Sequence, residues 1–225
     1  MIDKTIVALD FPDLETTKKF VDQVDDRISF VKVGMQLFYS DGKKVIEYLK
    51  SKDLKIFLDL KLHDIPSTVA KTLRVIESFE IEMTNVHVLG GSEMLEKAKD
   101  ALNKTLLLGV TILTSHHQES IKQLNLEQSI EGLVKSYHNL AHDTGLSGIV
   151  CSAKDLEFFE KRKGFLYVTP GIRLNENLHD QKRVVKPCEA FQYGSTHIVM
   201  GREITTSPEP RKFLDQLQEH YERHC

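Results

Sequence analysis

The chain concentrates charged residues between positions 57 and 66. There the apolar run Phe57-Leu58 leads into Asp59, Lys61 and Asp64, so that two carboxylates flank one ammonium group. Taking such ions out of water is costly, and pairing recovers this cost only in part. A protein that places them at the end of a buried strand is expected to use them, and catalysis is the first use to test.

The spacing of these charges predicts their chemistry. Asp59 and Lys61 are two residues apart, so on an extended strand their side chains face the same side, and Asp64 lies where the chain can turn back. With Lys32, from the apolar run Phe30–Val33, they form an alternating Lys-Asp-Lys-Asp array. Nearby carboxylates favour the charged form of an ammonium. We therefore predict a cationic Lys61 that stabilises a carbanion and then protonates it, not a neutral lysine nucleophile.

Short β-branched and aromatic runs recur at intervals that each leave room for one amphipathic helix. Eight runs predict strands, over Ile6–Leu9, Phe30–Val33, Lys55–Leu58, Met83–Val88, Leu106–Leu113, Gly148–Cys151, Phe165–Val168 and His197–Met200. Helices are predicted between and after them, over Leu14–Val24, Gly42–Ser51, Thr68–Phe79, Glu93–Leu102, Ile130–Asp143, Ala153–Lys161, Pro187–Tyr193 and Pro208–His220. This alternation predicts an α/β fold, a single-domain (β/α)8 TIM barrel over residues 1–225. An open doubly wound sheet is the alternative, although no Gly-x-Gly-x-x-Gly turn follows the first strand.

In such a barrel the active site lies at the carboxyl ends of the strands. The residues at these ends are rich in polar groups: Asp10, Lys32, Asp59, Lys61, His87, Thr114-Ser115, Pro170-Gly171-Ile172-Arg173 and Gly201-Arg202. Any one of them alone would suit a helix cap or a solvated side chain. Their convergence on one end of the barrel predicts a site.

The last predicted strand leads into Gly201-Arg202, where barrels commonly bind phosphate through backbone amides and a guanidinium group. Arg173 and Gln181 bracket the polar stretch 174–180. This stretch is either a lid that closes over a ligand or an ordinary solvated loop, and by itself its composition favours neither.

Composition narrows the class of partner and the compartment. Hydrophobic residues make up 40% of the 225, enough for one core, and 30 basic against 33 acidic residues give a formal charge of −3. We therefore expect no surface for nucleic acid. The first apolar run meets Asp10 too soon for a signal peptide or a membrane span, so we expect a cytoplasmic protein that binds no membrane.

The spacing of the cysteines and histidines suggests neither a disulfide framework nor a metal motif. Cys151, Cys188 and Cys225 lie far apart without a Cys-x-x-Cys spacing, so reduced thiols are expected. His138 and His142 have helical i,i+4 spacing but no acidic partner, which favours a surface pair over a metal site.

The segment Asp59-Leu60-Lys61-Leu62-His63-Asp64-Ile65-Pro66-Ser67-Thr68 resembles the signature of the orotidine 5′-phosphate decarboxylase family. Six more segments resemble family segments in the same order: Ala8-Leu9-Asp10, Val31-Lys32-Val33-Gly34, Asn85-Val86-His87, Leu113-Thr114-Ser115, Val168-Thr169-Pro170-Gly171-Ile172-Arg173 and Val199-Met200-Gly201-Arg202. The likeness covers nearly the whole chain and is to the shorter, stand-alone bacterial branch. It implies a homodimeric barrel that converts orotidine 5′-phosphate to UMP and CO₂, the last step of de novo UMP synthesis, with no metal and no cofactor.

The resemblance also implies roles for individual residues. Lys61 would stabilise the C6 carbanion and protonate it, Asp59 would lie beside the departing carboxylate, and Lys32 and Asp64 would complete the charge array. The substrate would be bound by Asp10, Lys32, Asp59, Lys61, Asp64, Ile65, Thr68, Thr114, Ser115, Pro170, Arg173, Gln181, Gly201 and Arg202. Asp64 and Thr68 would reach into the neighbouring subunit's site, so that each site needs both chains.

The sequence departs from the family pattern at two places, and two alternative functions are open. Val88-Leu89 stands where the family usually has small residues, and Glu203 places a carboxylate next to Arg202.

One alternative is a related sugar-phosphate decarboxylase or aldolase, which shares the Asp-x-Lys-x-x-Asp strand but uses Mg²⁺ to stabilise an enediolate. The other is an inactive barrel that only binds nucleotides, since a fold alone does not establish activity.

Overall fold

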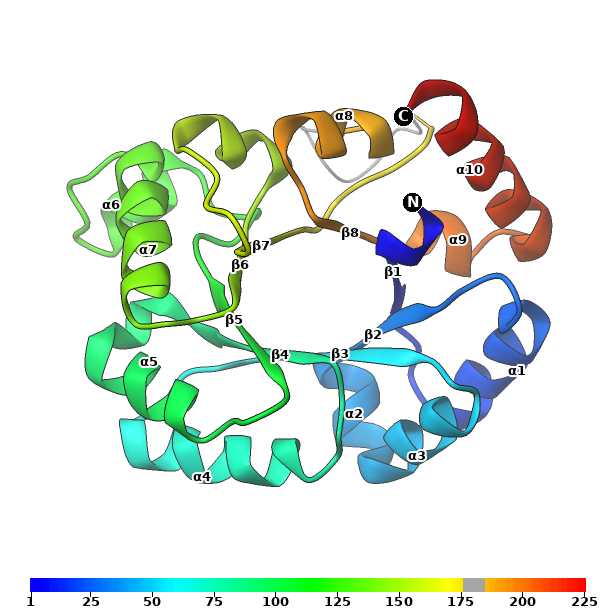
Figure 1. Ribbon diagram of the computed structural model, residues 1–225, viewed down its shortest axis with the longest axis horizontal. Coiled ribbons are helices and arrows are strands. Elements are labelled where there is room, and N and C mark those ends of the chain that lie inside the picture. The colour runs from blue at the N-terminus through cyan, green and yellow to red at the C-terminus, as the bar shows by residue number, and fades with distance from the viewer. Residues whose placement is uncertain (176–184) are drawn as a thin grey trace.

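Eight parallel strands close into a ring in the computed structural model, which describes residues 1–175 and 185–225. The strands are β1 Thr5–Leu9, β2 Phe30–Gly34, β3 Lys55–Leu62, β4 Met83–His87, β5 Leu106–Val110, β6 Gly148–Val150, β7 Leu166–Thr169 and β8 His197–Met200. Each pairs with the next along the chain, and β8 pairs with β1 (Figure 1). The predicted (β/α)8 barrel is confirmed. The open-sheet alternative is wrong, because the ring leaves no edge strand.

Helices surround the barrel (Figure 1). They are α1 Leu14–Val24, α2 Met35–Asp41, α3 Lys43–Ser51, α4 Pro66–Glu77, α5 Gly91–Asp100, α6 Gln118–Gln123, α7 Ile130–Asp143, α8 Pro187–Tyr193, α9 Arg202–Thr205 and α10 Pro210–His224. Three-residue 3-10 turns lie at η1 Ile2–Lys4 and η2 Val88–Gly90, and a longer one is η3 Ala153–Phe158. In the two described ranges, no helix has the length and apolar character needed to cross a membrane.

The helix predictions failed for three short helices. The sequence reading missed α2, α6 and α9, which have seven residues or fewer, too few for a repeating apolar face to stand out. The equally short α8 was predicted with its observed bounds, and a proline marks its first turn. It also predicted an α-helix over Ala153–Lys161, where the structure has the 3-10 helix η3. The long helices α1 and α7 begin and end at the predicted residues, and Asp13 and Ser129 cap their first turns by accepting from Thr16 N–H and Gly132 N–H.

The strands separate two layers of apolar side chains. Ile6 and Ala8 of β1 belong to a cluster built from strand residues that fills the barrel, whereas Val7 and Leu9 pack against the surrounding helices. Burial on both faces explains why the strands read as continuous apolar runs without alternation. Each fully buried valine, leucine or isoleucine side chain in these layers stabilises the fold by roughly 1.5–3 kcal/mol. The polar residues at the strand ends are therefore attached to a well-packed, rigid barrel.

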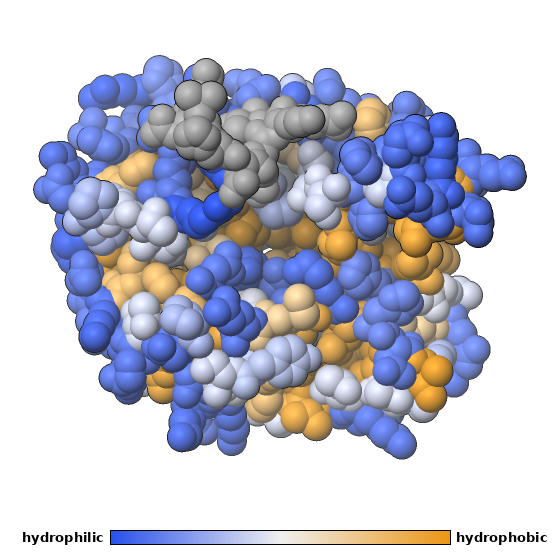
Figure 2. Space-filling view, turned by 180° about the vertical axis from the view of Figure 1, so that it is seen from behind, coloured by the Kyte–Doolittle hydropathy of each residue, from blue (hydrophilic) through white to orange (hydrophobic). Residues whose placement is uncertain are grey.

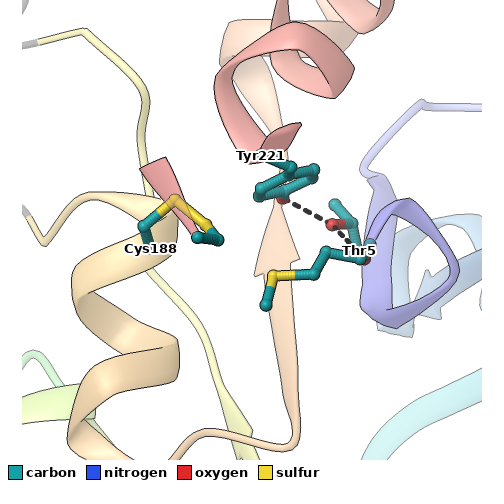
Figure 3. The surroundings of a disulfide bond; sticks show 5 residues. Thr5, Cys188 and Tyr221 are labelled. Carbon is teal, nitrogen blue, oxygen red and sulfur yellow. Dashed lines mark hydrogen bonds between the residues drawn. A yellow bond between two sulfur atoms is a disulfide. The ribbon is translucent and has the colours of Figure 1, made fainter. Parts of the chain in front are cut away.

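Cys188 and Cys225 form a disulfide, with Cα atoms 5.2 Å apart (Figure 3). The prediction of reduced thiols is wrong for this pair. The two cysteines are 37 residues apart and meet only because α8 and α10 pack side by side, so no local spacing could reveal them. Nearby, Tyr221 Oη lies 2.6 Å from Thr5 Oγ1, which ties α10 to β1 as well (Figure 3). Cys151 is a buried free thiol.

His138 of α7 is buried, with 2% of its surface exposed, so the expectation of a surface pair with His142 is wrong. Its ring stacks on Phe159 with a centroid distance of 4.0 Å, and its Nε2 lies 3.2 Å from Tyr167 Oη. Burial, and then the charge of Arg162, lowers the pKa of His138 to about 4. The folded protein therefore keeps the His138 ring neutral at neutral pH.

This histidine is expected to make the fold less stable in mild acid. Because its pKa of about 4 in the folded protein lies below the ordinary 6.5, its contribution is complete above pH 6.5 and is lost as the pH falls toward 4. Between pH 7.5 and 5.5 we expect a loss of about 1 kcal/mol in the free energy of unfolding. Urea unfolding of wild type and His138→Phe at both pH values measures this loss. The variant should lose about 1 kcal/mol less than wild type, and an equal loss would contradict the assignment.

Candidate active site

Polar side chains from the first four strands meet at the carboxyl end of the barrel. Asp10 directly follows β1, Lys32 lies in β2, Asp59 and Lys61 lie in β3, and Asn85 lies in β4. These strands are neighbours in the ring. Figure 2 shows the face turned away from the viewer in Figure 1, where hydrophilic side chains border a hollow near its centre.

Two lysines and two aspartates form a continuous series of ion pairs. Lys32 Nζ lies 3.0 Å from Asp10 Oδ1 and 3.5 Å from Asp59 Oδ2, and Lys61 Nζ lies 2.7 Å from Asp59 Oδ1. The side chains of Lys32 and Asp59 are 12% and 11% exposed, and that of Lys61 is 27% exposed. The predicted Lys-Asp-Lys array is therefore assembled within one chain, and Lys61 is its more accessible cation.

Gly34 has no side chain and so leaves room for the ion pair between Lys32 and Asp10. A Cβ atom at this position would lie 3.3 Å from Lys32 Nζ and 3.4 Å from Asp10 Oδ1, and the first distance is tighter than most real Cβ contacts. A larger residue at the end of β2 would require the Lys32 ammonium to shift by a few tenths of an ångström.

The backbone at Lys61 differs from the predicted extended strand. Lys61 has a φ of 52°, in the left-handed region that residues other than glycine rarely adopt. The pairing of β3 with β4 is irregular between Leu58 and Leu62, and a bulge of this kind re-aims a side chain. The predicted contact between Asp59 and Lys61 is therefore present, but simple strand alternation is the wrong explanation for it.

Asn85 holds the bulge in place. Its Oδ1 accepts a hydrogen bond from the backbone N–H of Lys61, and its Nδ2 donates one to Asp59 Oδ1, both at 2.7 Å. The residue is fully buried. The sequence reading assigned Asn85 no role; the usable signal was an amide inside an apolar strand, because a buried amide needs hydrogen-bond partners.

The array fixes the ionisation of its central carboxylate. Burial alone would raise the pKa of Asp59, but the charges of Lys32 and Lys61 and the hydrogen bonds from Lys61 and Asn85 hold it below its usual value. Burial, and then the charges of His63 and Lys61, lower the pKa of His87 at the end of β4. At neutral pH the site therefore combines an ionised Asp59 with a neutral His87.

A cavity of about 580 Å³ opens at the ends of β5, β6 and β7. Thr114, Ser115 and Pro170 line it, together with Ile172 and Asp155. Its volume falls in the range of small-molecule sites, and it combines hydroxyl groups with apolar walls. Residues predicted from two separate segments of the sequence thus share one cavity.

The residues predicted to bind phosphate follow β7 and β8. Arg173 lies four residues beyond the end of β7, and its N–H donates to the carbonyl of Val185 at 3.2 Å. Gly201 and Arg202 directly follow β8 and begin α9. Gln181 and most of the polar stretch 174–180 lie outside the described residues.

Asp64, Ile65 and Thr68 lie apart from the array: Asp64 and Ile65 are on the exposed turn between β3 and α4, and Thr68 is exposed in the first turn of α4. Asp64 Oδ1 accepts a hydrogen bond from Ile65 N–H at 2.7 Å, and Ile65 is 65% exposed. Within residues 1–175 and 185–225, no ion pair joins Asp64 to Lys32 or Lys61. The fourth member of the predicted array is thus turned outward in a single chain.

The chain is similar over nearly its full length to a known protein family and to bacterial proteins. Residues 3–217 match the model of the family described as Orotidine 5′-phosphate decarboxylase / HUMPS family. The orotidine 5′-phosphate decarboxylase of Carboxydothermus hydrogenoformans is 41% identical over 233 aligned residues, covering 97% of each chain. That of Ligilactobacillus salivarius is 44% identical over 220, covering 92% of this chain and 93% of its own.

The fold comparison agrees with the sequence comparison. The crystal structure of orotidine 5′-phosphate decarboxylase from Lactobacillus acidophilus superposes with a TM-score of 0.86 at 35% identity, covering 97% of this chain and 99% of that one. The resemblance inferred from the motifs is confirmed over nearly the full length. The chain belongs to the orotidine 5′-phosphate decarboxylase / HUMPS family of carboxy-lyases and related barrel enzymes.

Proposed function

We propose that this protein converts orotidine 5′-phosphate to UMP and CO₂ in the last step of de novo pyrimidine synthesis. The observation that carries the proposal is the Lys32–Asp59–Lys61 array, which presents a paired but accessible ammonium group at the mouth of the barrel. The names of the full-length relatives support the same substrate.

In the proposed reaction the bond between C6 and the carboxylate carbon breaks, CO₂ leaves, and the electron pair stays on C6. Lys61 stabilises this carbanion by its charge and then transfers a proton from Nζ to C6, after which solvent restores the proton. Asp59 keeps Lys61 in place and lies beside the departing carboxylate. Fixed charges of this kind stabilise developing charge at no cost of reorganisation, provided that water is excluded.

The donor and acceptor pattern around Asp59 supports chemistry without a metal. Its Oδ2 faces Lys32, and its Oδ1 faces both Lys61 and Asn85, so the carboxylate is occupied by protein cations and an amide. Lys61 thus takes the place that Mg²⁺ holds in the sugar-phosphate alternative.

We further propose a homodimer that completes each site with Asp64, Ile65 and Thr68 of the second chain. Asp64 and Ile65 lie on an exposed turn and Thr68 lies in the first turn of α4, all outside the array of their own chain. The neighbouring βα units also expose large apolar side chains, namely Met35 and Tyr39 on α2, Val75 on α4 and Leu89 after β4. A partner chain seated over these units would remove these side chains from water.

The proposal is tested by following the ultraviolet absorbance of orotidine 5′-phosphate with purified protein, with and without EDTA. We expect depletion of the substrate at a rate that EDTA leaves unchanged, because Lys61 and not a metal stabilises the carbanion. Activity that collapses in EDTA and returns with Mg²⁺ would favour the metal-dependent alternative. Protein that binds UMP but leaves the substrate intact would support the inactive barrel.

A further inference from the structure

Glu203, in the first turn of α9, binds the backbone that follows β7. Its Oε2 accepts a hydrogen bond from Leu174 N–H at 2.7 Å, and its Oε1 accepts one from Asn175 N–H at 2.8 Å. Two successive amides are therefore received by the two oxygens of one carboxylate. Hydrogen bonds to an ionised acceptor are shorter and stronger than those to a neutral one.

Both partners in this contact are held by the rest of the fold. Ile204, the next residue of α9, is fully buried, and Leu174 packs against the main core. On the other side of Leu174, the N–H of Arg173 donates to Val185 O at 3.2 Å, and Ile172 forms a parallel bridge with Val185. Arg173 therefore lies between two backbone attachments, and Glu203 supplies one of them.

The contact joins the two segments to which the proposed function assigns the phosphate. Arg173 immediately precedes the two amides that Glu203 binds, and Gly201 and Arg202 immediately precede Glu203 itself. One carboxylate thus links the segment after β7 to the turn after β8. The negative charge of Glu203 repels a phosphate bound nearby. Any benefit of Glu203 to phosphate binding must therefore come from the backbone geometry that its hydrogen bonds fix.

We propose that Glu203 is a positioning residue for phosphate recognition. It holds the backbone next to Arg173 against the turn that carries Gly201 and Arg202, and so sets the separation of the two phosphate-binding segments. This inference rests on the proposed function, because it deepens the assignment of the same site.

The test compares Glu203→Gln with wild type on orotidine 5′-phosphate and on orotidine, which lacks the phosphate. The Gln carbonyl accepts one amide, but its NH₂ group faces the other. We expect kcat/KM for orotidine 5′-phosphate to fall about tenfold, and that for orotidine to stay within about twofold. Affinity for UMP should fall by a similar factor, and affinity for uridine should not change. If the Glu203 carboxylate acted only by repelling the phosphate, Glu203→Gln would instead bind UMP more tightly than wild type.

Glu77 at the end of α4 offers a matched control. Its carboxylate accepts from the N–H groups of Asn103, Lys104 and Thr105, the same kind of contact, before β5 at the opposite end of the barrel. Glu77→Gln should lower the melting temperature without changing any of the four measurements.

Each remaining outcome decides the question. Equal losses on both substrates, no loss, or tighter UMP binding in Glu203→Gln would overturn the positioning role. If wild-type protein leaves orotidine 5′-phosphate intact, the proposed function fails. The comparison of UMP with uridine then still tests Glu203 by itself.

Discussion

Lys61→Ala is expected to lower kcat/KM for orotidine 5′-phosphate by about 10⁴-fold or more, because it removes both the cation at C6 and the proton donor. UMP binding should persist, since Asp59 keeps its contacts with Lys32 and Asn85 and the proposed phosphate-binding residues are untouched. Steady-state absorbance measures the first effect, and titration calorimetry with UMP measures the second.

Two controls separate the chemistry of Lys61 from its structural part. Lys61→Arg keeps a positive charge but carries a group that does not give up its proton, so it should also be nearly inactive. Added ethylammonium ions should restore part of the turnover of Lys61→Ala, and none of the turnover of Lys61→Arg, where the side chain fills the space. A Lys61→Ala protein that keeps more than about a tenth of wild-type activity would contradict general acid catalysis by this residue.

The barrel was predictable because its signal is local and repeated. Each strand is covered on both faces and therefore reads as an apolar run, and each long helix shows an apolar stripe, with a side-chain cap at the start of α1 and α7. The end of β5 shows the limit of this signal. The apolar residues Ile112 and Leu113 extend the run past Val110, where the strand ends, because they line the cavity.

The details of the site depend on contacts between segments that are distant in the sequence. Asp59 and Lys61 were identified from their types and spacing, yet the left-handed backbone at Lys61 is stabilised by Asn85, 24 residues away. Glu203 read only as a departure from the family pattern, because its two amide partners lie 29 and 28 residues earlier. The disulfide of Cys188 with Cys225 escaped prediction for the same reason.

The roles of several site residues stay predictions. The roles of Thr114 and Ser115 toward the pyrimidine and of Gln181 toward the phosphate need a bound ligand. The cytoplasmic location also stays a prediction. Sharing of the site between two chains is the prediction that most changes the picture of the enzyme, because a single chain would then hold an incomplete site.

Mixing inactive Lys61→Ala protein with inactive Asp64→Ala protein is expected to restore activity. If Asp64 completes the partner's site, one site of each mixed dimer combines an intact Lys61 with an intact Asp64, and the other site carries both lesions. Random exchange of equal amounts makes half of the dimers mixed, so about a quarter of wild-type activity should return. The recovery should follow the rate of subunit exchange, which fluorescence transfer between labelled chains measures independently.

The matched control mixes Lys61→Ala protein with a chain that carries both Lys61→Ala and Asp64→Ala. The same exchange occurs, but every site lacks Lys61, so no activity should return. If the first mixture also stays inactive while labelled chains exchange, Asp64 acts within its own chain. The exposed turn would then have to fold back by a route that its hydrogen bond to Ile65 N–H now opposes, since that bond holds the Asp64 carboxylate against its own backbone and away from Lys61.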